Sequence, residues 1–506
     1  MLIAKSPLVN TFWNSIGVGI SGSILFLVTP WYHSRLGVEG YGVITIWIMM
    51  QMMSSLFDMG ISASLVRAFN SGSSDEPPHI YKLNFLRTFE TIYWLGALLL
   101  GTITILASRY IVNHWLTFGY YSDADILKIL RIMISSVTLQ IPISLYMAGF
   151  SGLQDQKSQN IIQITVQLSR YGVGALILYW SNDLVYFFIL QTVISLFATY
   201  LIRIRLVKNI LGVSSALGKF KSRLLIEYWN FTGWMALTAI TALLVSNIDR
   251  IVLSKMVTLK DLGNYSLAFT AANVLQLSIQ PFYRAYFPRF NELVQLNDSD
   301  KSNREYFLSC RVMASILIPL SISTFFFGPD LLRFWLESTI INSDIILIFR
   351  LLIVAITCSG IMWLPAAYLQ ASGRGSIHFY MLFGALAIGT PIMVFFIRHY
   401  GPTAATTVWL IHGVSELTLG LWLIHRTLLL KSILNWYKLV LLGPIIISTS
   451  TILFYYFLVG TRSHTPPLIG FILVTIVSIM GSIVAFYKSL SHAEKKDLYK
   501  FNYVDN

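Results

Sequence analysis

The sequence predicts an all-α polytopic membrane protein with about 14 transmembrane helices. Apolar stretches, each close to the roughly 20 residues that cross a bilayer as a helix, follow one another over residues 10–487. The composition agrees, since 55% of the residues are hydrophobic, 12% are charged and the mean hydropathy is +0.67. Because an unpaired peptide group is costly in hydrocarbon, these stretches are expected to form helices and not strands.

The breaks between the apolar runs are charged or rich in Pro, Gly and Ser, and they set the helix boundaries. The predicted helices are 10–33, 42–66, 86–107, 126–150, 160–180, 184–204, 225–249, 262–287, 305–327, 345–371, 376–397, 403–425, 437–458 and 467–487. The first run lacks the pattern of a cleaved signal peptide, so we expect it to be the first span. The connections are short, which leaves no room for a separate catalytic domain.

Two sequence matches in the same register indicate that the first six helices are repeated. Residues 36–42 (LGVEGYG) align with 257–263 (VTLKDLG), and residues 151–154 (SGLQ) align with 367–370 (AYLQ). Because six is even, the two copies have the same orientation and a pseudo-two-fold axis along the membrane normal. The expected domains are a six-helix bundle (1–206), a basic cytoplasmic linker (207–224), a second six-helix bundle (225–426), and two additional helices with a cytoplasmic tail (427–506).

The basic residues are distributed unevenly between the loops, and the formal net charge is +13. Most lie on the side of the N-terminus, so the positive-inside rule places both termini in the cytoplasm. The segment 203–223 carries six basic residues and no acidic one. It is either a topological anchor or a site attracted to anionic lipids. No single basic face is formed, so a nucleic-acid partner is not expected.

No motif in the chain indicates a cofactor, a bound metal or a catalytic residue. Residues 17–22 fit G-x-G-x-x-G, but they lie inside the first helix without a preceding strand. Residues 212–219 resemble a phosphate-binding loop, but Phe220 stands where a Ser or Thr should bind magnesium. Metal-ligand spacings and a nucleophile elbow are also missing from the sequence. We therefore expect a protein that is not an enzyme.

Charged residues inside the helices are the candidate functional residues, because a charge at mid-bilayer costs about 2.5–3.5 kcal/mol even on an insertion scale. Arg170 and Glu416 lie near the middle of helices 160–180 and 403–425, too deep to reach the interface easily. We expect Arg170 to face an internal cavity, since its planar donors suit phosphate oxygens. The alternative is a buried structural pair between Arg170 and Glu416.

For the other charged residues inside the helices, a structural role is an alternative to a functional one. Arg131, Arg350 and Arg311 lie near helix ends and can extend to the interface. Asp58 and Asp249 can pair with nearby arginines or carry protons. The candidate cationic residues for substrate binding are Arg170, Arg131, Arg350, Arg311, Arg250 and Arg67, and the candidate ion-coupling carboxylates are Asp58, Asp249 and Glu416.

Three motifs resemble a known family. They are the Leu-Gly-x-x-x-Tyr-Gly loop at 36–42, the Phe-Asp-Met-Gly run at 57–60 followed by Arg67, and the Gly-Leu-Gln ending at 152–154. They resemble bacterial polysaccharide flippases, the O-antigen or Wzx-type transporters of the multidrug/oligosaccharidyl-lipid/polysaccharide exporter superfamily. The resemblance covers the first twelve helices, and the final two depart from the commonest pattern.

The resemblance implies a transporter for lipopolysaccharide or related surface polysaccharides. Such a protein moves an undecaprenyl-pyrophosphate-linked oligosaccharide across the inner membrane by ion-coupled alternating access. The implied partners are this glycan, membrane lipids and other polysaccharide assembly proteins.

Two other functions are kept as alternatives. A drug or cation exporter of the same superfamily would need exposed carboxylates, whereas the helices of this chain hold more Arg than acid. A membrane glycosyltransferase or polysaccharide polymerase would need a catalytic cluster on a sizeable outer loop, and the predicted loops are short.

Overall fold

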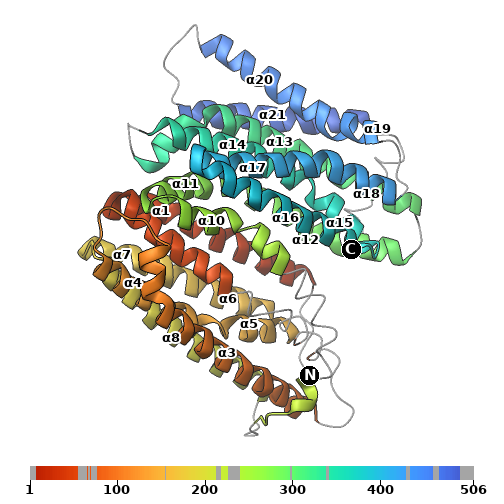
Figure 1. Ribbon diagram of the computed structural model, residues 1–506. Helices are drawn as coiled ribbons and strands as arrows, with labels where there is room; N and C mark the ends of the chain where they lie inside the picture. Colours follow the sequence, from red (N-terminus) through yellow and green to blue (C-terminus); the bar gives the residue numbers. More distant parts are fainter. Residues whose placement is uncertain are drawn as a thin grey trace. The chain divides into compact units, whose positions relative to one another are not determined.

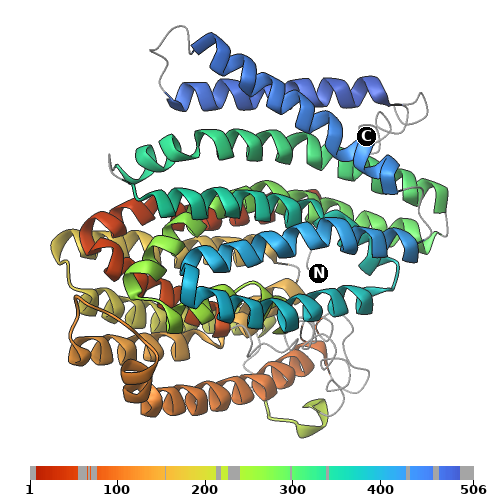
Figure 2. The same cartoon turned by 45° about the horizontal axis from the view of Figure 1, so that its top comes forward.

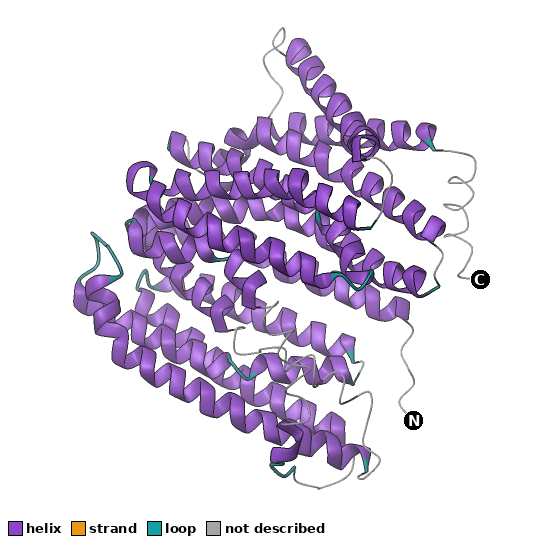
Figure 3. Cartoon of the chain, turned by 45° about the vertical axis from the view of Figure 1, so that its right-hand side comes forward, coloured by secondary structure: helices purple, strands orange, loops and turns teal. Residues whose placement is uncertain are grey.

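The computed structural model describes residues 7–54, 65, 69, 77–153, 155–211, 218–225, 240–296, 299–337, 341–428, 433–459 and 467–490. These residues form helices and no β-strand (Figure 3), and Thr117 and Thr258 form an isolated bridge. In this described part, eleven helical segments are long and apolar enough to cross a membrane. The all-α polytopic fold is confirmed, whereas the number 14 stays a prediction.

The chain divides into two compact units, Met1–Ser266 and Leu267–Asn506. In the first unit α4 packs along α3 and α8, and α1 packs against α6 (Figure 1). The predicted helix 225–249 lies partly outside the described residues. The helices of this unit are α1 (Pro7–Ser54), α3 (Pro78–His114), α4 (Asp123–Gln140), α5 (Ile143–Gly152), α6 (Gln156–Gln167), η2 (Leu168–Val173), α7 (Gly174–Trp180), α8 (Leu184–Leu211), α10 (Ile248–Met256) and the beginning of α11 (Leu259–Ala272).

The second unit is built around α13, which packs against α12, α14, α20 and α21. Figure 2 shows α20 and α21 together along one side of this unit, and α21 packs on α13. Its remaining helices are η3 (Asn273–Leu275), α12 (Gln276–Gln295), α13 (Ser299–Leu336), α14 (Ser343–Ile361), α15 (Trp363–Ala371), α16 (Gly375–Tyr400), α17 (Pro402–Ser415), η4 (Glu416–Gly420), α18 (Leu421–Thr427), α19 (Ile433–Tyr437), η5 (Lys438–Leu442), α20 (Gly443–Val459) and α21 (Pro467–Ser489).

Corresponding helices of the two predicted repeats share their irregularities. The third helices, α3 and α13, have 37 and 38 residues, which at about 1.5 Å per residue makes both longer than the hydrocarbon layer is thick. The fourth helix of each repeat is broken, between α4 and α5 at Ile141 and Pro142 and between α14 and α15 at Met362. These shared features support the alignment of the repeats.

Glycines of the repeated loop motif bring backbone segments into contact. The first two predicted helices meet without a loop at Gly37, whose φ of +69° is a conformation that glycine adopts readily. A Cβ added at Gly42 would lie 2.1 Å from the Leu259 carbonyl oxygen, and one added at Gly263 would lie 2.2 Å from that of Val38. In the sequence alignment Gly42 corresponds to Gly263 and Val38 to Leu259. The contact is therefore reciprocal, as a two-fold relation requires.

Large apolar side chains cover the outer face of α3. Leu95, Leu99 and Leu106 are 65%, 66% and 78% exposed. A soluble protein rarely exposes such a continuous apolar face, whereas in a bilayer the same face contacts lipid tails.

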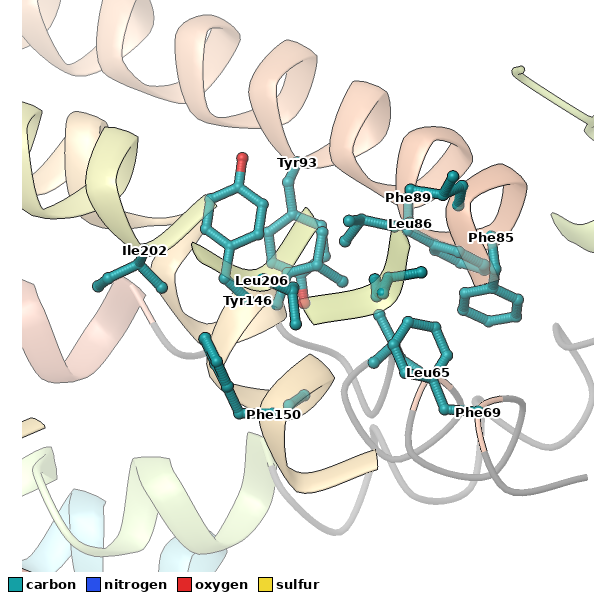
Figure 4. Packing of buried hydrophobic residues seen from close by; sticks show 14 of the residues in the cluster. Leu65, Phe69, Phe85, Leu86, Phe89, Tyr93, Tyr146, Phe150, Ile202 and Leu206 are labelled. Atoms are coloured by element: carbon teal, nitrogen blue, oxygen red, sulfur yellow. The ribbon is translucent and has the colours of Figure 1, made fainter. Parts of the chain in front are cut away.

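An aromatic cluster fills the space between α3, α5 and α8 (Figure 4). It contains Phe85, Phe89 and Tyr93 of α3 with Tyr146 and Phe150 of α5, and the rings of Phe85 and Phe89 are stacked. Burial of these large side chains fixes the three helices against one another.

A charged network lies at the edge of this cluster. The Glu90 carboxylate is 2% exposed, and Arg87 donates to its Oε2 over 3.1 Å. Arg203 donates to both of its oxygens, and the Tyr146 hydroxyl donates to Oε1 over 2.5 Å. Both oxygens are satisfied and the negative charge is balanced, so this is a structural ion pair.

Candidate functional site

Arg170 lies in a π-helical turn, η2, in the middle of the helix that runs from α6 to α7. Such a turn leaves backbone carbonyls without their usual partners in the helix, and π turns are frequent at functional sites. Two side chains from other helices donate to carbonyls of the turn. Gln191 Nε2 of α8 donates to the Arg170 oxygen over 2.8 Å, and the Tyr32 hydroxyl of α1 donates to the Tyr171 oxygen over 2.6 Å. The turn is thus held from both sides.

The Arg170 guanidinium is buried, with 4% of the residue exposed, and its contacts are neutral. Nη1 donates to Gln51 Oε1 of α1 over 2.6 Å and to Gln140 Oε1 at the end of α4. Nη2 donates to Ser195 Oγ of α8 over 3.2 Å. Among the described residues, no carboxylate lies within ion-pair distance of it. The positive charge of Arg170 is therefore solvated by amide and hydroxyl dipoles without being balanced.

A pocket of about 500 Å³ in the N-terminal unit opens onto Arg170. Three glutamines of α6, Gln159, Gln163 and Gln167, follow one another at four-residue intervals, so they share one helix face and form a row that ends beside Arg170. Apolar side chains of α5, α6 and α8 complete the wall. The volume is in the range of about 300–1,000 Å³ that is usual for small-molecule sites.

Several polar atoms at this pocket are unsatisfied. In the described part of the chain, Gln51 Nε2, Gln167 Oε1 and Arg170 Nε are buried and have no hydrogen-bond partner. Buried polar groups are nearly always paired in native proteins, so two donors and one acceptor around one pocket indicate a place for a polar ligand. A ligand that fits this pocket has hydrogen-bond acceptors for the Arg170 guanidinium and hydroxyl groups for the glutamine amides.

The structure places Arg131 and Arg350 outside this pocket. Arg131 is exposed on α4 and donates from Nε to Ser108 Oγ over 3.2 Å. Arg350, its counterpart in α14, donates from Nε to the Phe325 carbonyl over 3.2 Å and lies 5.3 Å from the centroid of that ring. Their matching positions in the two repeats and their local contacts favour an interfacial position for both.

Three further predicted residues lie in other surroundings. Asp249 of α10 is fully buried and accepts a hydrogen bond from the Tyr265 hydroxyl of α11. The neighbouring Arg250 is also buried and lies 3.9 Å from the Met52 sulfur. Arg311 lines a separate pocket of the C-terminal unit. Asp58 and Arg67 fall outside the described residues.

Glu416 begins a π-helical turn, η4, in the C-terminal unit. His412, one turn earlier on the same helix, has its Nε2 3.6 Å from Glu416 Oε1, and both side chains are 14% exposed. An imidazole next to a carboxylate in a largely buried place can hold or release one proton. The pair was not expected from the sequence, although the four-residue spacing could have indicated it.

The glutamines were also missed by the sequence analysis. Gln51, Gln140 and Gln167 are uncharged, so they do not stand out as ionisable residues in an apolar helix. A readable signal existed only for the row Gln159, Gln163 and Gln167, whose four-residue spacing is that of one helix face.

Solved structures of known proteins have a similar fold. The structure is similar to a lipid II flippase, MurJ, in an inward closed conformation, with a TM-score of 0.71 and 14% identity, over 95% of this chain and 99% of that one. It is also similar to an inward-facing multidrug resistance MATE family transporter of the MOP superfamily, with a TM-score of 0.60 and 12% identity, over 83% and 94% of the two chains. The fold is thus that of polytopic, all-helical transporters of this superfamily.

The family follows from the sequence. The model of the polysaccharide biosynthesis protein family matches residues 8–294, more than half of the chain. A protein from Shigella flexneri named as a presumed O-antigen transporter is 27% identical over 428 residues, which are 82% of this chain and 97% of that protein. The chain belongs to the polysaccharide biosynthesis protein family. It is a multi-pass inner-membrane transporter, and the prediction of a transporter in place of an enzyme is confirmed by these relatives.

Proposed function

We propose that this protein moves an undecaprenyl-pyrophosphate-linked oligosaccharide across the inner membrane by alternating access. In this proposal the polar head of the lipid enters the pocket of the N-terminal unit while the prenyl tail stays in the bilayer. The pocket lowers the barrier to crossing because it replaces water around the pyrophosphate and the sugars with hydrogen-bonding side chains.

The observation that carries the proposal is the unbalanced charge of Arg170 beside a row of glutamines. A guanidinium binds phosphate oxygens through charge-assisted hydrogen bonds, and amides bind sugar hydroxyls. The second candidate function is a drug or cation exporter. In such a protein the positive charge of Arg170 would repel a cationic substrate. The family match and the named O-antigen transporter relative also favour a glycan.

The decisive experiment replaces Arg170 and follows transport of the lipid-linked glycan in vesicles. Arg170→Gln should lower the initial rate by roughly tenfold to a hundredfold, because it removes one to two charge-assisted hydrogen bonds. Arg170→Lys keeps the positive charge but loses the planar guanidinium with its paired N–H donors, so it should keep part of the transport rate. The matched control is Arg109→Gln on the exposed face of α3, which should transport normally. Normal rates in both Arg170 variants would remove this residue from the substrate path.

Ion coupling is assigned in this proposal to Glu416 together with His412. Their separation of 3.6 Å lets the pair share one proton, whose binding and release would accompany the change between the two faces of the membrane. In a Glu416→Gln protein, transport should no longer respond to a pH gradient, whereas Asp344→Asn, an exposed carboxylate of α14, should leave the response unchanged. A full response in the Glu416 variant would exclude this pair as the coupling site.

A further inference from the structure

A second polar pocket, of about 420 Å³, lies in the C-terminal unit between the beginning of α13, α19 and η5. Its α13 residues are spaced so that they share one helix face. The residues that line it include Asp300, Asn303, Arg304, Phe307, Arg311 and Asn435. It thus combines two cations, two amides and one carboxylate, and neither the proposed transport path nor the comparisons explain it.

Arg311 forms the deep end of this pocket. It is 5% exposed and lies eleven residues after Asp300, which is about 16 Å further along the helix. Its Nη2 donates to Ser489 Oγ, and its guanidinium carbon lies 4.9 Å from the centroid of the Phe486 ring. Both partners belong to α21, so this helix fixes the orientation of the cation.

Arg304 lies two turns nearer the start of α13 and is exposed. Two long arginine side chains on one face can converge on a single group between them, and their forks match the oxygens of a phosphate. Asn303 and Asn435 add amide donors from two different helices. This is the donor set of a phosphate-binding site.

We propose that this pocket binds the head group of a membrane phospholipid that carries an amine next to its phosphate. The arginines bind the phosphate, and Asp300, in the first turn of α13, binds the amine that projects beyond it. The apolar side chains of Phe307 and Leu439 belong to the same wall. The predicted topology places the start of α13 at the inner leaflet, where basic pockets between helices bind lipid head groups.

The bound lipid has a structural consequence. The pocket lies between α13 and the chain that leads into α20, and its deep arginine contacts α21. These two helices stand outside the predicted sequence repeat. A phospholipid in this pocket therefore links the additional helices to the repeated bundle.

The test measures lipid binding to the full-length, delipidated protein by native mass spectrometry. The probes are dioleoyl phosphatidylethanolamine, dioleoyl phosphatidylglycerol and dioleoylglycerol, and inorganic phosphate and pyrophosphate are the competitors. We expect one phosphatidylethanolamine per protein, weaker phosphatidylglycerol binding and no retention of dioleoylglycerol. Arg304→Gln should weaken phosphatidylethanolamine binding roughly tenfold. Asp300→Asn should remove the preference over phosphatidylglycerol, and Arg398→Gln, an exposed residue of α16, is the matched control.

Different outcomes overturn different parts of the proposal. Equal lipid retention in wild type and Arg304→Gln would show that the pocket is not the lipid site. Arg304 is chosen for this test because replacing the buried Arg311 would disturb the fold more. Displacement of the lipid by millimolar inorganic phosphate would assign the pocket to a soluble anion. Stronger displacement by pyrophosphate would assign it to the carrier lipid. The readout does not involve transport, so failure here is distinct from failure of the proposed function.

Discussion

Among the buried charged residues of the N-terminal unit, Glu90 and Arg170 have opposite surroundings. Glu90 is 2% exposed and is contacted by two arginines and a tyrosine, so its charge is balanced and both of its oxygens are satisfied. Arg170 is 4% exposed and is contacted by two amides and a hydroxyl, so its charge has no counter-ion among the described residues.

The difference separates a structural charge from a functional one. A buried ion pair contributes little when intact, but losing one partner is strongly destabilising. A buried charge held by neutral dipoles keeps its electrostatic potential for a ligand of opposite sign. The pocket in front of Arg170 gives such a ligand room, whereas both oxygens of Glu90 are already occupied by protein donors.

The largest expected effect on stability comes from removing Glu90. Glu90→Ala should lower the free energy of unfolding by about 3 kcal/mol, because Arg203 and Tyr146 lose their buried partner. Arg170→Gln should change it by less than about 1 kcal/mol, since glutamine still bonds to the neighbouring amides. Denaturant unfolding of both variants in the same detergent checks this. Equal losses would mean that charge balance does not distinguish the two sites.

A second variant makes the two regions alike. Gln140→Glu places a carboxylate on an existing partner of Arg170 and should convert the cation into a balanced pair like that at Glu90. We expect transport to fall about tenfold or more, while the unfolding midpoint is unchanged or higher. Gln156→Glu, on the first turn of α6 and outside the pocket lining, is the control. Normal transport in Gln140→Glu would argue against an anionic ligand at Arg170.

The sequence was informative where the physics is local. Apolar runs of bilayer length predicted the helices, and the depth of Arg170 in its run predicted an internal position. The aligned loops made Gly42 and Gly263 equivalent positions of the two repeats, and their reciprocal contacts with backbone carbonyls agree with this. The break predicted between the first two helices lies at Gly37 inside α1, whose backbone is not helical, and it takes one residue because a glycine at positive φ can turn the chain without a loop.

The sequence was less informative where the contact joins distant segments. Gln51 and Arg170 are 119 residues apart and meet only when α1 and η2 pack. Arg203 and Glu90 are 113 residues apart, so the balance of the Glu90 charge was equally hidden. A residue's charge can be read from the sequence, but whether a neighbour balances that charge depends on the tertiary packing.

The smallest effects come from the hydroxyl partners of the two charges, and they should differ in kind. Tyr146→Phe removes a donor to Glu90 and should cost about 1.5 kcal/mol of stability, with normal transport by the folded protein. Ser195→Ala removes the 3.2 Å contact to Arg170 and should cost about 0.5 kcal/mol, but it should lower transport twofold to threefold because the guanidinium is less well oriented. Unfolding and vesicle transport measured on the same preparations check both. If Tyr146→Phe impaired transport and Ser195→Ala did not, the roles given to the two buried charges would have to be exchanged.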